Sequence, residues 1–336
     1  MQFFLNRNIF KGINFYMQEI GKPQCDCVTS PPSIIENNKR RIVAIGDIHG
    51  DLHALLSALH TASVIDVYGN WIGNDTIVVQ LGDQIDKGGR GVITNEIFPT
   101  EELQILEYLH HLHNEAQTTN GAVYTLLGNH EIMNIQGNFN YVHDKHIIGF
   151  GGYEQRRALF QPGGPISKLI ACHSNAIMKI GNWVFVHAGL LPSHLYNFSI
   201  GEINFQVRNA LLGFSDLSKL EIPYLWDRTY ANHGDKPCYL LQDVLDILKI
   251  DVNKGGMVIG HSVQPNITHK CSKNLWLIDI GMSSAFHHYK NLKKVQVLEI
   301  INDGDVVNII QESETYTCNE KSTYTADNMV IIKNDG

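Results

Sequence analysis

Residues 42–50 read IVAIGDIHG, and this stretch decides the fold. It begins with an apolar run of the length expected for a buried strand, and the run stops at Gly46 and Asp47. Leucines then recur at helical spacing, so we predict a helix that begins near Asp51. A strand, a glycine turn and a helix in this order are typical of an α/β sheet, in which ligand sites lie beyond the carboxyl ends of the strands.

Four later strands are predicted to end in the same way. The apolar runs 76–81, 122–127, 183–186 and 257–259 are followed by GDQIDKGG (82–89), GNHE (128–131), HAGL (187–190) and GHS (260–262). Glycine lets the backbone turn sharply at such points, and polar side chains appear where burial stops. Residues 101–113 have an amphipathic helical pattern, and residues 275–280, 295–301 and 306–310 resemble a terminal set of antiparallel strands.

The five strand ends together offer carboxylate, imidazole and amide side chains: Asp47, His49, Asp83, Asn129, His187 and His261. Such donors suit manganese, iron or zinc, and the lack of a thiolate disfavours a structural zinc site. The set is larger than one ion and a catalytic water need, and it suits two ions about 4 Å apart that share one carboxylate. Each motif alone has a simpler explanation, such as Asp47 capping a helix or His187 filling the core. Their order and their shared position at strand ends favour a dimetal site.

The overall composition is that of a globular protein. Of 336 residues, 43% are hydrophobic, and no apolar run reaches the length of about 18 residues that a membrane-spanning helix needs. The formal net charge of −8 argues against general nucleic-acid binding, which needs a basic face. The 17 histidines are an unusual excess, and because histidine is the commonest metal ligand they direct attention to metal chemistry.

The chain is predicted to carry extensions at both ends. Residues 1–40 are an N-terminal extension with a linker rich in Pro, Ser and Asn, and residues 313–336 are a C-terminal tail. Residues 41–312 form the predicted domain, in which about 132–175, with weak periodicity and many glycines, is a cap or insertion. The N-terminus lacks the apolar centre of a signal peptide, which predicts a cytoplasmic address. The six cysteines are too scattered for the disulfide framework of a small secreted domain, and free thiols are expected at Cys25 and Cys27.

The five motifs, in this order, resemble those of the PPP-type metallophosphatases of the calcineurin-like superfamily. Within that group the chain is most similar to the bacterial-type Shewanella-like phosphatases, because it also contains GNWIGNDTIVVQLGDQID (69–86), LWDR (225–228) and LIDIGMSS (277–284). The resemblance spans about residues 41–300. It implies an α/β fold with a central β-sandwich of two mixed sheets flanked by helices, and a dimetal site at the loop-bearing edge of that sandwich.

The resemblance also implies roles for the matched positions. Asp47 and His49 would bind the first ion, and Asp83 would bridge the two ions. The second ion would be bound by Asn129, His187 and His261. His130 would be the general acid that protonates the leaving oxygen, and Asp86 would be its hydrogen-bond partner. The nucleophile would be metal-bound hydroxide that attacks in line, so that no covalent phosphoenzyme is needed.

The second motif departs from the family pattern at one position. The family commonly has Asp-Arg-Gly there, whereas this chain has Asp86, Lys87 and Gly88. Lysine is a point charge and cannot make the bidentate contact of arginine, so Lys87 is expected to neutralise phosphate more weakly. Arg228, in LWDR, is the best remaining candidate for the bidentate contact, with a surface or capping role as the alternative. ApaH-like phosphatases of the kinetoplastid type also carry lysine at this position.

The sequence therefore predicts a dimetal-dependent phosphomonoester hydrolase that acts on phosphoproteins, with Ser/Thr or Tyr specificity left open. The alternative enzyme is an ApaH-like hydrolase of dinucleoside polyphosphates or RNA caps, although no aromatic clamp for a nucleoside is evident. A catalytically dead scaffold is disfavoured, because every expected ligand and His130 are present. Manganese is the metal expected to support activity. The oligomeric state is left open.

Overall fold

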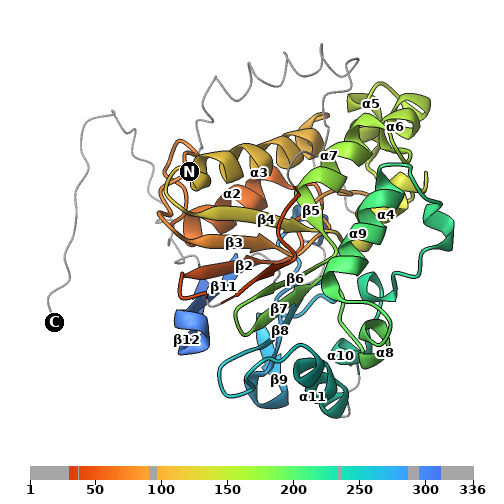
Figure 1. Cartoon of the computed structure of the whole chain (residues 1–336). Coiled ribbons are helices and arrows are strands. Elements are labelled where there is room, and N and C mark those ends of the chain that lie inside the picture. Colours follow the sequence, from red (N-terminus) through yellow and green to blue (C-terminus); the bar gives the residue numbers. More distant parts are fainter. Residues whose placement is uncertain (1–29, 37, 91–96, 233–236, 287–294, 312–336) are drawn as a thin grey trace, which may run out of the picture.

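Two six-stranded sheets form the centre of the molecule, whose computed structural model describes residues 30–36, 38–90, 97–232, 237–286 and 295–311 (Figure 1). The first sheet has the order β12 (Val306–Gln311), β11 (Gln296–Ile301), β2 (Ile42–Ile45), β3 (Ile77–Gln80), β4 (Ala122–Leu126) and β5 (Ser174–Asn175). The second has the order β1 (Ile34–Ile35), β6 (Ile177–Ile180), β7 (Trp183–Val186), β8 (Gly256–Ile259), β10 (Leu275–Leu277) and β9 (Thr268–Lys270). Both sheets contain parallel and antiparallel pairs, which confirms the predicted arrangement of two mixed sheets.

Helices flank the two sheets. Those that pack on the first sheet are α2 (Leu52–Thr61) and α3 (Glu101–Gln117) (Figure 1). Those that pack on the second are α7 (Pro165–His173), α9 (Ile200–Leu211) and α11 (Cys238–Ile247). The shorter helices are α4 (Asn129–Ile135), α5 (Asp144–Gly149), α6 (Tyr153–Phe160), α8 (Pro192–Leu195) and α10 (Thr229–Asn232), and the 3-10 turns are η1 (Leu217–Lys219), η2 (Pro223–Leu225), η3 (Cys271–Lys273), η4 (Ser284–Phe286) and η5 (Asn302–Gly304). Within the described ranges, every helix is too short or too polar to cross a membrane.

The strand at the centre of the first sheet is apolar throughout because both of its faces are covered. All four residues of β2 are buried, and β2 pairs in parallel with β3, as expected for a strand between two packed layers. The helix predicted to follow it begins at Leu52, and the Asp51 side chain caps it by accepting a hydrogen bond from the backbone N–H of Ala54 (3.1 Å). Asp51 is therefore the capping residue at this turn, and Asp47 is left free for another role.

Two sequence expectations about strands need correction. Residues 275–280 were expected to join a terminal antiparallel set, but β10 lies in the second sheet, where it pairs in parallel with β8 and antiparallel with β9. Only β11 and β12 form the expected antiparallel pair at the end of the first sheet. In addition, the described part of the predicted N-terminal extension contains β1, which pairs in parallel with β6.

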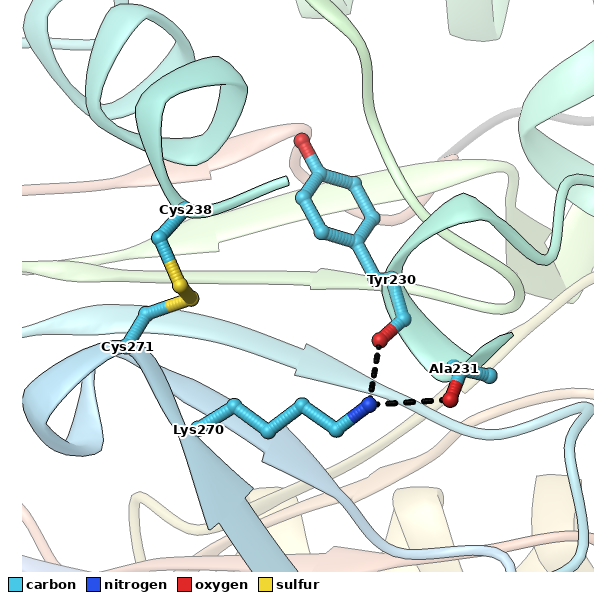
Figure 2. Close-up of a disulfide and its surroundings, with 5 residues drawn as sticks. All are labelled: Tyr230, Ala231, Cys238, Lys270 and Cys271. Atoms are coloured by element: carbon cyan, nitrogen blue, oxygen red, sulfur yellow. Dashed lines mark hydrogen bonds between the residues drawn. A yellow bond between two sulfur atoms is a disulfide. The ribbon is translucent and has the colours of Figure 1, made fainter. Parts of the chain in front are cut away.

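The chain contains a disulfide that the spacing of the cysteines did not suggest. Cys238, at the start of α11, is bonded to Cys271, which follows β9, although the two lie 33 residues apart in the sequence (Figure 2). Next to this bond, the Lys270 ammonium donates hydrogen bonds to the carbonyl oxygens of Tyr230 (2.9 Å) and Ala231 (2.8 Å). These contacts hold α10 and α11 against the edge of the second sheet. Cys25 and Cys27 lie outside the described residues.

Candidate active site

The predicted ligands come together beyond the ends of β2, β3, β7 and β8 and at the start of α4. Candidate ligand atoms of His49, Asp83 and His130 all lie within 4.8 Å of one another, and so do those of Asp83, His187 and His261. Every residue of both groups is buried. Asp83 belongs to both groups, which is the arrangement expected of a carboxylate shared by two ions.

Asp47 and Asn129 lie beside these two groups. Asp47 Oδ2 lies 3.9 Å from His49 Nε2 and accepts a hydrogen bond from the backbone N–H of His261 (3.1 Å). Asn129 Oδ1 lies 3.1 Å from His187 Nε2. The Nε2 atoms of His49 and His187 lie 3.6 and 3.3 Å from Asp83 Oδ2. The structure thus brings all six predicted ligands into one cluster of facing oxygen and nitrogen atoms.

The electrostatics of this cluster fit a cation site. Three buried carboxylates converge there, those of Asp47, Asp83 and Asp279. Burial and the charge of Asp279 raise the pKa of Asp47 well above its ordinary value. Among the described residues, the buried Oδ2 atom of Asp279 has no hydrogen-bond partner. Divalent cations would compensate this crowding, and the donors are of the kinds that manganese, iron and zinc accept.

Backbone strain is concentrated at the same place. His49, Asp83, Asp86 and His261 have positive φ angles of 44°, 50°, 75° and 63°. Residues other than glycine adopt this left-handed conformation at a cost of roughly 1–2 kcal/mol each. Such strain persists only where surrounding contacts impose it, and it is typical of functional sites.

Glycine precedes several of the predicted ligands because the neighbouring carboxylates leave no room for a side chain. A Cβ atom at Gly128 would collide with the Asp83 carboxylate, and one at Gly260 would collide with the carboxylate of Asp47. The GN of the third motif and the GH of the fifth are thus explained by the close approach of backbone from one motif to a ligand from another.

Glu131 joins the second motif to the third. This buried carboxylate accepts hydrogen bonds from the backbone N–H groups of Asp83 (3.0 Å), Gln84 (2.8 Å) and Gly128 (2.7 Å). It therefore fixes the turn that carries Asp83 relative to the turn that carries Asn129. Sequence analysis quoted Glu131 within GNHE without giving it a role.

His130 and Asp86 form the predicted pair. His130 Nδ1 lies 2.7 Å from Asp86 Oδ2, which leaves Nε2 facing the pocket. Burial lowers the pKa of His130, but the charges of Asp83 and Asp86 outweigh burial and hold it above its ordinary value. The geometry therefore suits a protonated imidazole that can donate a proton from Nε2.

A cavity of about 780 Å³ opens over this cluster. Besides site residues already described, its walls include two arginines, three aromatic rings and a methionine: Arg90, Arg228, Tyr141, Trp226, Phe286 and Met133. Arg228 donates hydrogen bonds from Nη1 to the His261 carbonyl oxygen (3.0 Å) and to Ser262 Oγ (2.8 Å), so its guanidinium is held at the cavity wall. The structure thus places Arg228 in the wall of the cavity over the ligand cluster.

The structure directs Lys87 away from the cavity. Lys87 Nζ lies 3.1 Å from Glu101 Oε1 and 3.3 Å from Asp51 Oδ2, and its side chain is 3% exposed. The cation that reaches the cavity from this segment is Arg90, whose Nη2 lies 3.0 Å from His49 Nδ1 and 3.4 Å from His130 Nε2. Arg90 lies one residue beyond the predicted motif, which ends at Gly89. The signal available was the second basic residue in GDQIDKGGR.

Comparison with known proteins agrees with this site. Residues 40–276 match the family model of calcineurin-like phosphoesterases. Shewanella-like protein phosphatase 2 of Arabidopsis thaliana is 31% identical over 297 residues, which cover 73% of this chain and 72% of that protein. Shewanella-like protein phosphatase 1 of Plasmodium berghei is 31% identical over 285 residues, covering 76% and 71%. A solved cold-active protein-tyrosine phosphatase of a psychrophilic Shewanella species has a TM-score of 0.67 at 21% identity, covering 86% of this chain and 85% of that one.

The chain is therefore a hydrolase of phosphoric monoesters with a calcineurin-like fold, and its family uses two divalent metal ions. It belongs to the calcineurin-like phosphoesterases, among the Shewanella-like phosphatases. This confirms the resemblance that the five motifs suggested.

Proposed function

We propose that this chain is a phosphoprotein phosphatase whose two ions share Asp83. Asp47 and His49 are assigned to the first ion, and Asn129, His187 and His261 to the second. The observation that carries the proposal is the pair of ligand groups with Asp83 in common. His130 belongs to the first group, but its Nδ1 is paired with Asp86, and we assign it to the proton rather than to an ion. When bound, the ions would supply an activated water and compensate charge on the phosphoryl oxygens.

The chain's own residues supply substrate binding and the proton. We assign Arg90 and Arg228 to the phosphate oxygens in place of Lys87, because both guanidinium groups line the cavity and Lys87 does not. His130 donates its Nε2 proton to the leaving oxygen, while Asp86 holds Nδ1 and so fixes the direction of the ring.

Aromatic side chains around the cavity favour an aryl phosphate. The rings of Tyr141, Trp226 and Phe286 line it. They offer apolar contact to the ring of a phosphotyrosine, and a phosphoserine has no ring that could make this contact. Phosphotyrosine is accordingly the substrate we expect to be cleaved best. The names of the relatives, which are protein phosphatases, support a phosphoprotein substrate.

The test uses the purified full chain with p-nitrophenyl phosphate and added manganese. We expect hydrolysis that excess chelator abolishes. With phenyl phosphate, whose leaving oxygen needs a proton, we expect His130→Asn to lose turnover while it retains bound metal. Full activity in chelator would overturn the dimetal assignment. A panel of phosphotyrosine peptide, phosphoserine peptide and diadenosine tetraphosphate under one metal condition then tests the substrate. Exclusive cleavage of the tetraphosphate would replace the proposal with the ApaH-like alternative.

The cytoplasmic location remains a prediction, and the Cys238–Cys271 disulfide is evidence against it. Structural disulfides persist mainly in oxidising compartments. Fractionation of the cells that make this protein, together with thiol labelling of the freshly isolated chain, would decide the matter.

A further inference from the structure

A buried chain of polar side chains lies behind the His130–Asp86 pair, on the side away from the cavity. Its members are fully or almost fully buried, and they belong to three helices: Asn134 of α4, Arg156 of α6 and Glu102 of α3. None of the three lines the cavity over the ligand cluster. They therefore have no direct contact with a substrate bound there. Their effect on the reaction has to pass through Asp86 and through the His130 backbone, whose carbonyl oxygen accepts a hydrogen bond from Asn134 Nδ2 (3.0 Å).

The Asp86 carboxylate and backbone have four hydrogen-bond partners, one of which is Arg90, whose Nη1 donates to the Asp86 carbonyl oxygen (2.9 Å). Oδ2 contacts His130 Nδ1 (2.7 Å), and Oδ1 accepts a hydrogen bond from Asn134 Nδ2 (2.8 Å). The backbone N–H of Asp86 donates to Glu102 Oε1 (2.8 Å). Because Asp86 also has a positive φ of 75°, these contacts are what keep a strained residue in place.

Arg156 determines the orientation of the Asn134 amide. Its Nε and Nη2 groups both donate to Asn134 Oδ1, at 3.0 and 2.7 Å, and its Nη1 donates to Glu102 Oε2 at 2.7 Å. A guanidinium offers donors only, so the amide oxygen has to face Arg156 and the amide NH₂ has to face Asp86. Loss of Arg156 would remove both donors that hold the amide oxygen on this side, and only the two hydrogen bonds of the NH₂ group, to Asp86 and to the His130 carbonyl oxygen, would then fix the amide.

The guanidinium itself cannot rotate away from this position. It lies 4.6–5.5 Å from the ring centroids of Phe160, Phe150 and Phe139, and the side chain is completely buried. A charge in such a place costs desolvation energy, and well-packed apolar residues often replace a buried ion pair without loss of stability. A purely structural role therefore gives a weak explanation for Arg156.

We propose that Arg156, acting through Asn134, is a positioning residue for the general acid. It fixes the Asp86 carboxylate, which in turn points the His130 Nε2 proton at the leaving oxygen. This inference rests on the proposed function, in which His130 is the acid. The segment 132–175 would then have a function in catalysis, because it contributes Arg156, the residue that orients the acid.

The test compares two substrates that differ in how much they need the acid. A p-nitrophenolate ion leaves readily without a proton at neutral pH, whereas phenolate, like a tyrosine side chain with a pKa of about 10, needs one. Arg156→Lys keeps the charge but cannot make the paired contact to Asn134. We expect its kcat/KM to fall about 10-fold or more with phenyl phosphate, and less than about 3-fold with p-nitrophenyl phosphate. The reference is His130→Asn, in which the loss of kcat/KM with phenyl phosphate should exceed the loss with p-nitrophenyl phosphate by the largest factor.

A second variant keeps the test decisive if Arg156→Lys does not fold. Asn134→Asp retains an acceptor for Arg156 and the shape of the side chain, but it removes the donor to Asp86, and it should reproduce the difference between substrates. The matched control is Arg157→Lys, the same substitution at an exposed neighbour on α6, which should leave kcat/KM unchanged with both substrates. Bound metal and melting temperature are measured for each variant.

Two outcomes would separate the possible failures. If Arg156→Lys and Asn134→Asp lower kcat/KM equally for both substrates, or lower it for neither, Arg156 has only a structural role and the inference is wrong. If the unmodified chain shows no metal-dependent hydrolysis of either substrate, the proposed function fails, whatever the variants do.

Discussion

The two cations of the GDQIDKGGR segment should respond oppositely to the same substitution. Lys87 lies against Asp51 and Glu101, and all three side chains are at most 7% exposed. Lys87→Met would leave the buried Asp51 carboxylate without its cation and would leave Glu101 with His146 Nε2, at 3.7 Å, as its charged partner among the described residues. Breaking a buried pair in this way costs about 3–5 kcal/mol. For a domain of this size we expect the melting temperature to fall by roughly 6–15 °C.

Arg90→Met should instead affect the reaction. The Arg90 guanidinium is only half-buried, and it lies 4.7 Å from the Phe286 ring and 5.3 Å from the Tyr141 ring, at the cavity wall. Its expected contacts are to a phosphate, and each hydrogen bond to a charged group contributes about 1.5–3 kcal/mol. The loss of two such bonds, about 3–6 kcal/mol, corresponds to a decrease of roughly 10²–10⁴-fold in kcat/KM.

Thermal unfolding and p-nitrophenyl phosphate kinetics, measured on both variants in the same buffer, test this division. Lys87→Met should unfold early yet keep kcat/KM within about 3-fold at a temperature where it is folded. Inhibition by inorganic phosphate should weaken in Arg90→Met alone. The reasoning is refuted if Lys87→Met loses activity as Arg90→Met does while both remain folded, because Lys87 would then contact the substrate.

Three further results are expected. The carboxylates of Glu102 and Glu101 outweigh burial and raise the pKa of His146 to about 9, above its ordinary 6.5, so its stabilising charge is present below pH 6.5 and is lost as the pH rises through 9. In urea unfolding, the excess stability of the unmodified chain over His146→Gln should thus shrink by about 3 kcal/mol across that window, and a constant excess would contradict it. Glu131→Gln, which leaves one of three N–H donors facing an NH₂ group, should weaken manganese binding about 10–100-fold in calorimetric titration. Reduction of the disulfide, which spans 33 residues, should cost about 3–4 kcal/mol of unfolding free energy, and an unchanged midpoint would show that the bond is dispensable.

The ligand cluster could be predicted from sequence because its signal is local. Each motif follows an apolar run, and the first polar residue after the run has to lie at the end of a buried strand. Parallel pairing of β2, β3 and β4 then brings these ends to one edge of the sheet, so Asp47, Asp83 and Asn129 meet without further information.

The position of Arg90 at the cavity and the buried chain of polar side chains behind Asp86 could not be predicted in this way, because they do not depend on local sequence. Whether Lys87 or Arg90 reaches the cavity depends on where Glu101 lies, and Glu101 is placed by the packing of α3. The segment 132–175 showed weak periodicity for a related reason. Two of its fully buried side chains, Arg156 and His146, are of types that pattern analysis assigns to the surface.

Two adjacent carboxylates at the start of α3 organise much of the region behind the active site. Successive residues of a helix point in directions about 100° apart, so neighbours reach different partners. Glu101 holds Lys87 away from the cavity, whereas Glu102 holds both Arg156 and the backbone N–H of Asp86. The helix N-terminus favours both negative charges. Lys87 pairs with Glu101 and Asp51. Arg90, whose Nη1 donates to the carbonyl oxygens of Asp86 and Gly88, lines the cavity instead. The replacement of arginine by lysine in the second motif is therefore compatible with the phosphate contact proposed for Arg90.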